Sequence, residues 1–468
     1  MSGVGTSDGF AERRTIDRIP ESERHGFARD QFTLWFGANL QITAVLDGAL
    51  AVVFGAEAMT AIVGLAVGNI LGGIVMALHS AQGPRLGLPQ MISSRAQFGV
   101  RGATLPLLLV ILMYLGFAAT GTVLAGQAMN LLLGVSNPAV GMVIFGVLSA
   151  VIALVGYKVI HIMGRIATVI SILGFAYLSY QLFHQYDIHS AFGQKPATVA
   201  TFLLAVSLSA GWQLTYAPYV ADYSRYLPSA TSGGKAFLYT LLGSAIASQL
   251  AMTFGVLVAA VGAKFLSNQV GFLGTLAGQG AVLVYIVIIC GKLTINCLNA
   301  YGGFMAILTT FTSFSNQTRI SRGARALYII GFVALSVLIA VLASADFLSA
   351  FKNFVLMLLA VFVPWSAINL IDYYLISREK VDIPALYDAT GRYGAYNWTA
   401  LGCYVLGVVV QIPFLNQPLY EGPIAVALND ADISWAVSLV VTAVVYYLLQ
   451  RNTKVAPREM IFDGATQS

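Results

Sequence analysis

Residues 38–43 read Ala-Asn-Leu-Gln-Ile-Thr, and residues 210–215 read Ala-Gly-Trp-Gln-Leu-Thr. Both hexapeptides fit the pattern A-x-x-Q-[I/L]-T, and they occupy the same place in the first and the sixth apolar stretch of the chain. Transporters built from inverted repeats contain helices that are broken at mid-membrane in corresponding positions of the two halves. Small and polar residues favour such local unwinding, although small residues also serve ordinary helix packing in membranes. The two hexapeptides therefore predict a five-plus-five inverted repeat whose first helices are interrupted.

The composition around these hexapeptides indicates that lipid is the solvent for most of the chain. Of the 468 residues, 58% are hydrophobic and 10% are charged, whereas a soluble domain usually carries about 25% charged residues. A membrane helix needs about 20 mostly apolar residues, and twelve stretches meet this requirement. The expected fold class is an all-α polytopic membrane protein with twelve transmembrane helices. Their approximate limits are 31–56, 58–81, 103–134, 137–157, 162–183, 199–221, 236–262, 280–311, 325–345, 350–376, 397–415 and 433–450.

The basic residues predict the orientation of these spans. If the N-terminus is cytoplasmic, all but four of the 25 Lys and Arg residues lie in inner segments. Lys195, Lys264 and Lys352 fall in outer loops, and Lys292 falls within a span. Because cytoplasmic loops carry an excess of Lys and Arg, we expect a multi-pass protein of the plasma (inner) membrane with both termini cytoplasmic. No apolar core follows the arginine-rich residues 1–30 at signal-peptide distance, so we interpret them as an uncleaved cytoplasmic tail.

The sequence lacks the signatures of several other functional classes. It contains no GxxxxGK[ST] phosphate loop and no HExxH motif, and no Ser/His/Asp arrangement is evident. The three cysteines (Cys290, Cys297 and Cys403) lie in apolar segments, so we expect buried thiols rather than disulfides or metal ligands. We therefore expect a carrier that is not an enzyme, with no cofactor and no firmly assigned metal site.

Span eight carries the richest set of polar residues at membrane depth. Lys292, Asn296 and Asn299 are spaced i, i+4, i+7 and therefore share one helix face. Polar residues at this depth are costly and are functional candidates, although a single Asn also serves as a contact between helices. Three on one face favour a hydrated cavity.

The chemistry of these side chains suits a flat heterocycle. An Asn amide offers one acceptor and two donors in a plane, which matches the mixed edge of a pyrimidine or purine. Stacking on an aromatic side chain contributes about 1–3 kcal/mol per base. Trp212 and Tyr114 lie near the middle of spans six and three, so they are candidates for such stacking. We interpret Trp35, Trp398 and Trp435, which lie near span ends, as interface anchors.

Asp47 is the other charged residue at depth. Counting ~1.5 Å per residue from the outer ends, Asp47 lies ~15 Å deep and Lys292 lies ~18 Å deep. Because a lone charge there is costly, we hypothesise that the two form an ion pair or a proton-sensitive couple beside the substrate site. A purely structural pair is the alternative.

Longer motifs point to one family. The segment Gly-Pro-Arg-Leu-Gly-Leu-Pro-Gln-Met-Ile-Ser-Ser-Arg-Ala-Gln-Phe-Gly at 83–99 is the most specific. The other segments are Trp-Phe-Gly-Ala-Asn-Leu at 35–40, Gly-Trp at 211–212, Ala-Asp-Tyr-Ser-Arg-Tyr at 221–226, Asn296 and Asn299, and Pro-Trp-Ser-Ala-Ile-Asn-Leu-Ile-Asp-Tyr-Tyr-Leu at 364–375. Together these segments resemble nucleobase–cation symport family 1, in its purine–cytosine permease branch, over nearly the whole chain.

The resemblance implies a leucine-transporter-like fold. Spans one to five (31–185) and spans six to ten (199–376) are then inverted repeats. The last two spans (397–450) are peripheral, and residues 451–468 form a cytoplasmic tail. We also expect the basic inner loop from Arg85 to Arg101 to contact phospholipid or to gate the inner mouth, with any one of its arginines more often solvated.

The resemblance also implies the site. Trp212 is expected to stack on the base, and Asn296 and Asn299 to hydrogen-bond its edge. Family members often carry a tryptophan and, four residues later, an amide in span three, where this chain has Tyr114 and Ala118. The full expected substrate set is Trp212, Asn296, Asn299, Gly211, Asn39, Gln213 and Tyr114. The expected cation-coupling set is Ala38, Gln41, Thr294, Lys292 and Asp47.

These expectations describe a secondary active transporter that imports cytosine or purines by cation symport with alternating access. The coupling ion is H⁺ or Na⁺, and Lys292 favours H⁺. The expected partners are a small nucleobase and membrane lipid, with no nucleic acid and no obligate protein partner. One alternative is the same fold carrying allantoin, a hydantoin or a vitamin precursor. A membrane-embedded receptor or enzyme, or a channel, are alternatives from other classes.

Overall fold

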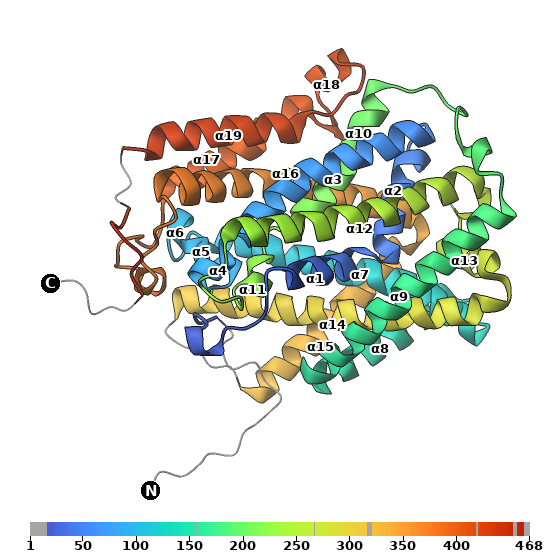
Figure 1. Cartoon of the computed structure of the whole chain (residues 1–468), viewed down its shortest axis with the longest axis horizontal. Helices are drawn as coiled ribbons and strands as arrows, with labels where there is room; N and C mark the ends of the chain where they lie inside the picture. The colour runs from blue at the N-terminus through green and yellow to red at the C-terminus, as the bar shows by residue number, and fades with distance from the viewer. Residues whose placement is uncertain are drawn as a thin grey trace, which may run out of the picture.

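The computed structural model describes residues 16–155, 157–265, 267–315, 321–417, 420–452 and 456–462. In this part of the chain the regular secondary structure is helical apart from one short hairpin and an isolated bridge between Asp382 and Ile461. The long helices run mainly along the longest axis, and the first and last described segments lie at one end (Figure 1). The helices are α1 (Asp30–Asn39), α2 (Ile42–Val53), α3 (Ala58–Ser80), α4 (Gly83–Leu86), α5 (Gln90–Ser93), α6 (Arg95–Phe98), α7 (Thr104–Leu133), α8 (Pro138–Val155), α9 (Tyr157–Gln185), α10 (Val199–Leu214), α11 (Ala221–Ser224), α12 (Gly233–Val261), α13 (Gln269–Ala277), α14 (Ala281–Phe314), α15 (Arg322–Ala343), α16 (Phe347–Leu370), α17 (Trp398–Val409), α18 (Pro423–Ala427) and α19 (Ser434–Gln450). The hairpin pairs β1 (Asn416–Gln417) with β2 (Tyr420–Glu421), and a π-helical turn, η6 (Ile371–Ile376), continues α16.

Each of the twelve predicted spans contains a helix of the structure. Within the described residues, five helical segments are long and apolar enough to cross a membrane, or six if the bent pair α1–α2 counts as one. Two of the five, 269–314 and 323–376, include α13 with α14 and α15 with α16. Four shorter apolar helices accompany them. The polytopic helical class is confirmed, whereas the number twelve stays a prediction.

The interruption predicted in the first span is present. Helices α1 and α2 meet at an angle of 59°, with Leu40 and the extended Gln41 between them. The Gln41 side chain donates to the Ala38 carbonyl at 2.8 Å, which satisfies an acceptor that the break frees from the helix. In the sixth span the interruption comes at the end of the hexapeptide. Helix α10 ends at Leu214, and residues 215–220 form turns before α11.

Two groups of helices pack separately. Helices α1, α2, α3, α10 and α12 pack against one another, and we call them the bundle. Helices α7, α8, α14 and α15 form a second group, which we call the scaffold. Helices α17 and α19 pack on α16 at the edge of the molecule, as Figure 1 shows. The division into repeats at 31–185 and 199–376 stays a prediction.

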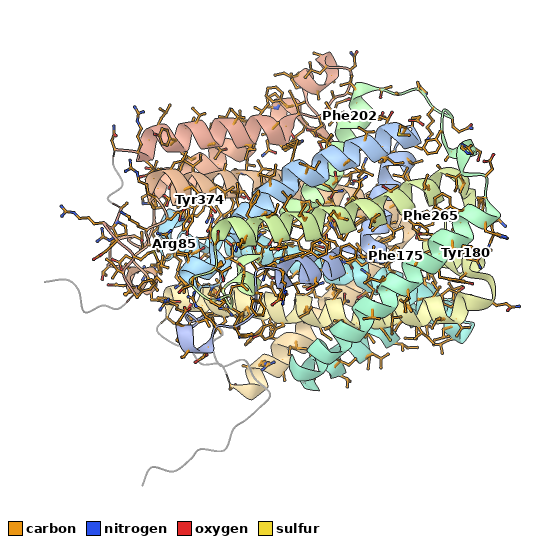
Figure 2. The ribbon with its side chains drawn as sticks, viewed as in Figure 1. Arg85, Phe175, Tyr180, Phe202, Phe265 and Tyr374 are labelled. Carbon is orange, nitrogen blue, oxygen red and sulfur yellow. The ribbon has the colours of Figure 1, made fainter. Side chains whose placement is uncertain are left out.

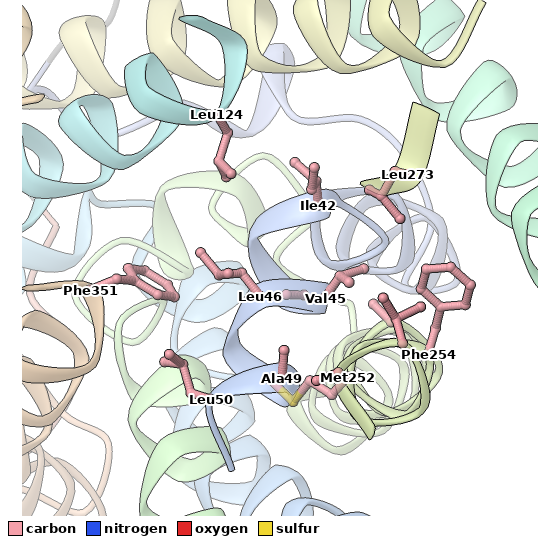
Figure 3. Close-up of a cluster of buried hydrophobic side chains, with 14 of the residues drawn as sticks. Ile42, Val45, Leu46, Ala49, Leu50, Leu124, Met252, Phe254, Leu273 and Phe351 are labelled. Carbon is pink, nitrogen blue, oxygen red and sulfur yellow. The ribbon is translucent and has the colours of Figure 1, made fainter. Parts of the chain in front are cut away.

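Helix α2 lies at the centre of the largest apolar cluster. Figure 3 shows Ala49 beside Met252 of α12, with Leu46 and Leu50 on the side that faces Phe351 of α16. The approach to α12 is a contact between backbones. A Cβ atom added at Gly255 would lie 1.9 Å from the Val45 carbonyl oxygen. Only glycine therefore fits at this crossing.

Gly255→Leu is expected to lower the apparent melting temperature of the detergent-purified protein. Overpacking costs about 1–3 kcal/mol when neighbours can shift, and here the obstacle is backbone. Gly402→Leu on α17 is the matched control, because nothing lies within 4 Å of a Cβ atom at that position. Equal melting temperatures of the two variants would contradict the close packing of α2 on α12.

The loop after α3 differs from the expectation of a lipid-contacting segment. Residues 83–100 fold into α4, α5 and α6 and are almost all buried. The Arg95 guanidinium donates to the carbonyls of Thr309 at 2.9 Å and Leu386 at 3.1 Å. Burial lowers the pKa of Arg95 to about 10, against the opposing effect of Tyr387, so the side chain stays cationic at neutral pH. A cation at the C-terminal end of α14 is favourable, which explains its burial.

Arg85 fits the expectation of a solvated arginine. Its half-exposed side chain pairs with Glu379 at 2.5 Å, at the same end of the molecule as the first and last described segments (Figure 2). The prediction that this loop gates the inner mouth stays a prediction.

The described part of the N-terminal tail, residues 16–30, makes contacts that its polar composition did not predict. Ile16 and Ile19 are buried, and Arg24 donates to the carbonyls of Pro84 and Ile19. The described part of the tail therefore packs on the loop after α3.

The expectation for the cysteines is wrong at one position. Cys297 and Cys403 are buried free thiols, as expected, but Cys290 is a free thiol on the exposed face of α14. An apolar segment does not distinguish a face turned toward lipid from one turned toward protein.

Candidate substrate and cation site

Trp212 lies near the end of α10 with 1% of its surface exposed. Its indole Nε1 donates to Asn39 Oδ1 at 2.7 Å. The rings of Phe117 and Tyr216 contact it edge to face, with centroids 5.9 and 5.8 Å away. Because a protein acceptor satisfies the indole N–H, a ligand can use only the ring of Trp212.

Tyr114 belongs to a neighbouring aromatic group. Its ring lies 5.3 Å from that of Tyr219, and a Cβ atom at Gly302 would lie 2.4 Å from its Cζ. The interpretation of Trp35 as an interface anchor is wrong, since Trp35 is 2% exposed and packs edge to face on Tyr216. Because the first span bends, α1 packs against the bundle, and Trp35 is buried there. Trp398, by contrast, is 73% exposed.

The two asparagines of α14 have different surroundings. The Asn296 amide nitrogen donates to the Ala118 carbonyl at 3.0 Å and to Thr122 Oγ1 at 3.2 Å, which ties α14 to α7. The Asn299 amide nitrogen is buried and has no hydrogen-bond partner. The Asn296 amide oxygen is also buried without a partner. Buried polar groups without partners are costly, so the Asn299 donor and the Asn296 acceptor both have unused capacity for a ligand.

Lys292 reaches the break in the first span. Its ammonium group donates to Gln41 Oε1 at 2.9 Å and to Thr43 Oγ1. It thereby joins α14 of the scaffold to the junction of α1 and α2 in the bundle. A positive charge thus lies among oxygen atoms at a broken helix, which is where transporters of this architecture bind cations.

The hypothesis of an ion pair between Asp47 and Lys292 is wrong for this structure. Asp47 is fully buried, and neither of its carboxylate oxygens has a hydrogen-bond partner. Lys292 lies level with the break and bonds Thr43, whereas Asp47 lies four residues, about 6 Å, further along α2. The proton-sensitive role of the two residues stays a prediction.

Thr294 does not join this group. It follows Lys292 by two residues, which places it about 200° around the helix. Its hydroxyl donates to the Cys290 carbonyl at 3.1 Å. Of the expected cation set, the structure therefore brings together Ala38, Gln41 and Lys292 but places Thr294 on another face.

Three residues of the expected substrate set are held by protein partners. Asn39 and Gln213 are fully buried and hydrogen-bond to serines of α12. Gly211 packs against α16, where a Cβ atom would lie 3.1 Å from Val355 Cγ1. These three residues therefore contact α12 and α16 and support the segment that carries Trp212.

Several residues of the site were missed from the sequence. Phe117 follows Tyr114 by one helical turn and is the span-three aromatic residue that contacts Trp212. Ser244 and Ser248 are one turn apart on α12, and Asn69 lies at membrane depth in α3. The sequence offered two signals by which these residues could have been found, namely the spacing of the two serines and the polar side chain of Asn69 within an apolar span.

Comparisons with known proteins give a consistent picture. Residues 18–438 match a family described as permease for cytosine/purines, uracil, thiamine, allantoin. The putative purine-cytosine permease YxlA of Bacillus subtilis is 38% identical over 443 residues, covering 94% of this chain and 96% of that protein. The purine-cytosine permease fcyB of Emericella nidulans is 24% identical, covering 94% and 88%. The hydantoin permease of Microbacterium maritypicum is 23% identical, covering 82% and 81%.

Solved structures match in fold. The inward-facing conformation of Mhp1 superposes with a TM-score of 0.76 at 18% identity, covering 94% of this chain and 93% of that one. Mhp1 in a closed conformation, described as a nucleobase-cation-symport-1 family transporter with bromovinylhydantoin bound, gives 0.72 at 20% identity, covering 93% and 94%. The expected leucine-transporter-like fold is thereby confirmed.

Proposed function

The chain belongs to the family of permeases for cytosine/purines, uracil, thiamine and allantoin, and from this premise we propose that it imports cytosine or a purine by proton symport. It is a multi-pass membrane transport protein and not an enzyme, because the family and its relatives are permeases. The substrate, the ion and the cytoplasmic location of both termini are parts of the proposal.

The hydrogen bonding of Trp212 and Asn299 is the observation on which the substrate assignment rests. Trp212 is held by Asn39 so that only its ring is available, and Asn299 has an amide nitrogen without a partner. A flat heterocycle with acceptors on its edge satisfies both groups at once. Relatives named as purine-cytosine permeases support a nucleobase as that heterocycle.

Lys292 supports the proton as the coupling ion. Its ammonium group lies on Gln41 and Thr43 at the helix break, so it supplies from the protein the charge that a bound cation would bring. Loss of the proton removes that charge and weakens the contact between scaffold and bundle, because a neutral amine donates weaker hydrogen bonds than an ammonium group. Asp47 is a second candidate carrier, because protonation removes the cost of an unpaired buried carboxylate.

We propose alternating access as the mechanism, and this division of the molecule supports it. Bundle and scaffold pack as separate groups, and the proposed site lies where α1, α7, α10 and α14 meet. Trp212, Asn296 and Asn299 are each under a tenth exposed, so substrate entry requires the groups to move apart. A cation that binds one arrangement more tightly than the other shifts this equilibrium, which is the coupling.

A thermal-shift screen of the purified protein tests the proposal. The panel contains cytosine, adenine, guanine, hypoxanthine, uracil, allantoin and a benzylhydantoin, each with and without sodium in acidic and alkaline buffer. A ligand that binds the folded state raises the melting temperature. We expect stabilisation by cytosine or a purine that depends on pH and not on sodium. Stabilisation by allantoin or the hydantoin alone would move the substrate to another heterocycle, and sodium dependence would overturn the proton assignment.

Asn299→Ala is expected to weaken nucleobase binding and to leave the melting temperature of the empty protein nearly unchanged. The Asn299 amide nitrogen makes no hydrogen bond within the protein. Its removal should therefore reduce the free energy of ligand binding, by about 1–3 kcal/mol, and not the stability of the empty protein. Asn296→Ala is the matched comparison and is expected to lower the melting temperature, because it removes the bonds to Ala118 and Thr122. If Asn299→Ala melts lower while affinity is kept, the assignment of Asn299 fails.

A further inference from the structure

Four buried side chains form a closed ring of hydrogen bonds behind Trp212. Asn39 Nδ2 donates to Ser244 Oγ at 3.0 Å, and Ser244 Oγ donates to Gln213 Oε1 at 2.6 Å. Gln213 Nε2 donates to Ser248 Oγ at 3.2 Å, and Ser248 Oγ donates back to Asn39 Oδ1 at 2.8 Å. All four residues are fully buried. We call this set the amide–serine ring.

The ring links both interrupted helices through a third helix. Asn39 is the last residue of α1, and Gln213 lies one residue before the end of α10. Ser244 and Ser248 are spaced i, i+4 on α12, so their hydroxyls lie on one face and meet both amides. Each hydroxyl donates one bond and accepts one. Removal of Ser244 leaves Gln213 Oε1 without its donor, and removal of Ser248 takes one of two partners from Gln213 Nε2 and from Asn39 Oδ1.

The ring has contacts on two sides that matter for transport. On one side, Asn39 Oδ1 also accepts the indole N–H of Trp212. On the other side, Asn39 precedes Gln41 by two residues, and Gln41 receives the ammonium group of Lys292. A continuous chain of side-chain and backbone contacts therefore runs from the proposed proton carrier to the proposed stacking residue.

We propose that Asn39, Ser244 and Ser248 are positioning residues that couple the state of the cation site to the orientation of Trp212. This inference rests on the proposed function. When the charge at the break changes, the junction of α1 and α2 shifts, Asn39 shifts with it, and the ring transmits the movement to Trp212. Substrate affinity then depends on the cation, and by reciprocity cation affinity depends on the substrate.

A ring that served stability alone would behave differently. Its loss would lower the melting temperature and weaken binding in all conditions alike. Loss of a coupling element instead reduces the ratio of substrate affinities measured with the cation site charged and uncharged. That ratio is therefore the quantity that separates the two roles.

The experiment measures cytosine or purine dissociation constants of the full-length detergent-purified protein in acidic and in alkaline buffer. The wild-type ratio is expected to lie in the usual range of coupling, about five- to 150-fold. Ser244→Ala and Ser248→Ala are each expected to reduce it to below roughly twofold. Ser336→Ala on α15 is the control, because its buried hydroxyl bonds only the Val333 carbonyl at 2.8 Å, and it should keep the wild-type ratio.

Asn39→Asp adds a test by partial rescue. Aspartate keeps the oxygen that accepts from Trp212 and Ser248 but loses the amide nitrogen that donates to Ser244 and to the Trp35 carbonyl. It is therefore expected to keep more of the ratio than Asn39→Ala. Equal loss in both variants would contradict a role for the shared acceptor.

Tryptophan fluorescence tests, without a substrate, whether the amide–serine ring couples the cation site to Trp212. The difference between wild type and Trp212→Phe isolates the emission of Trp212, which we expect to change between acidic and alkaline buffer. Ser244→Ala and Ser248→Ala should lose this change while Ser336→Ala keeps it. If no nucleobase binds, the proposed function fails, and the fluorescence of Trp212 still tests the role of the amide–serine ring. A ring variant that keeps the wild-type pH response of Trp212, or a wild-type protein without one, would overturn the inference.

Discussion

Trp212→Ala is expected to weaken nucleobase binding by about 5- to 150-fold, the equivalent of losing one stacked base at about 1–3 kcal/mol. The ring of Trp212 is held by the Asn39 bond and by edge-to-face contacts with Phe117 and Tyr216. It is therefore oriented before the ligand arrives, and little ordering entropy is spent on binding. Dissociation constants of purified variants provide the measurement.

Two further variants sharpen this prediction. Trp212→Phe keeps a ring but not the indole N–H, so we expect an intermediate loss. Trp398→Ala, at a residue that is 73% exposed, should bind as tightly as wild type. If Trp212→Ala folds and binds within twofold of wild type, the stacking assignment is wrong.

Lys292→Met is expected to abolish accumulation of substrate driven by a pH gradient while exchange of labelled for unlabelled substrate continues. Methionine keeps much of the length of the side chain but cannot carry a proton. Gln41 and Thr43 then face an apolar group at all pH values. Because the coupling ion no longer distinguishes the two arrangements, the gradient cannot shift their populations. Uptake and counterflow in proteoliposomes measure the two quantities separately.

Lys352→Met is the matched control for this effect. Lys352 is a lysine of α16 whose ammonium group lies 3.8 Å from the ring centroid of Phe54, away from the break. It should keep gradient-driven uptake. Full gradient-driven uptake by Lys292→Met would show that the proton is carried elsewhere, and Asp47→Asn would be the next variant.

Hydrophobicity was sufficient to predict the helical membrane class, and the repeated hexapeptide to predict the break between α1 and α2. The second break was predicted less well, since α10 continues through Trp212 and Gln213 to Leu214. Depth counted along straight helices failed for Asp47 and Lys292 because it ignores the 59° bend and the direction in which each side chain points.

Other errors have a common cause. Position in the linear sequence does not specify what a residue faces. Trp35 was placed at the interface because it lies near a span end, although it is buried, and Cys290 was expected to be buried because its segment is apolar, although it is exposed. The amide–serine ring joins residues more than 200 positions apart, and its members look unremarkable one at a time. Arg95 was expected only as part of a basic loop that contacts phospholipid or gates the inner mouth, and its burial was missed because its carbonyl partners lie far along the chain.

Uptake of radiolabelled cytosine and of purines by wild-type protein in proteoliposomes tests the central claim most directly. The vesicles are loaded at neutral pH and diluted into acidic medium, into sodium medium without a pH gradient, or into medium with neither gradient. The account predicts saturable accumulation above equilibrium with the pH gradient alone, lost when an uncoupler dissipates it. Accumulation driven only by sodium, or none with any nucleobase of the panel, would contradict it.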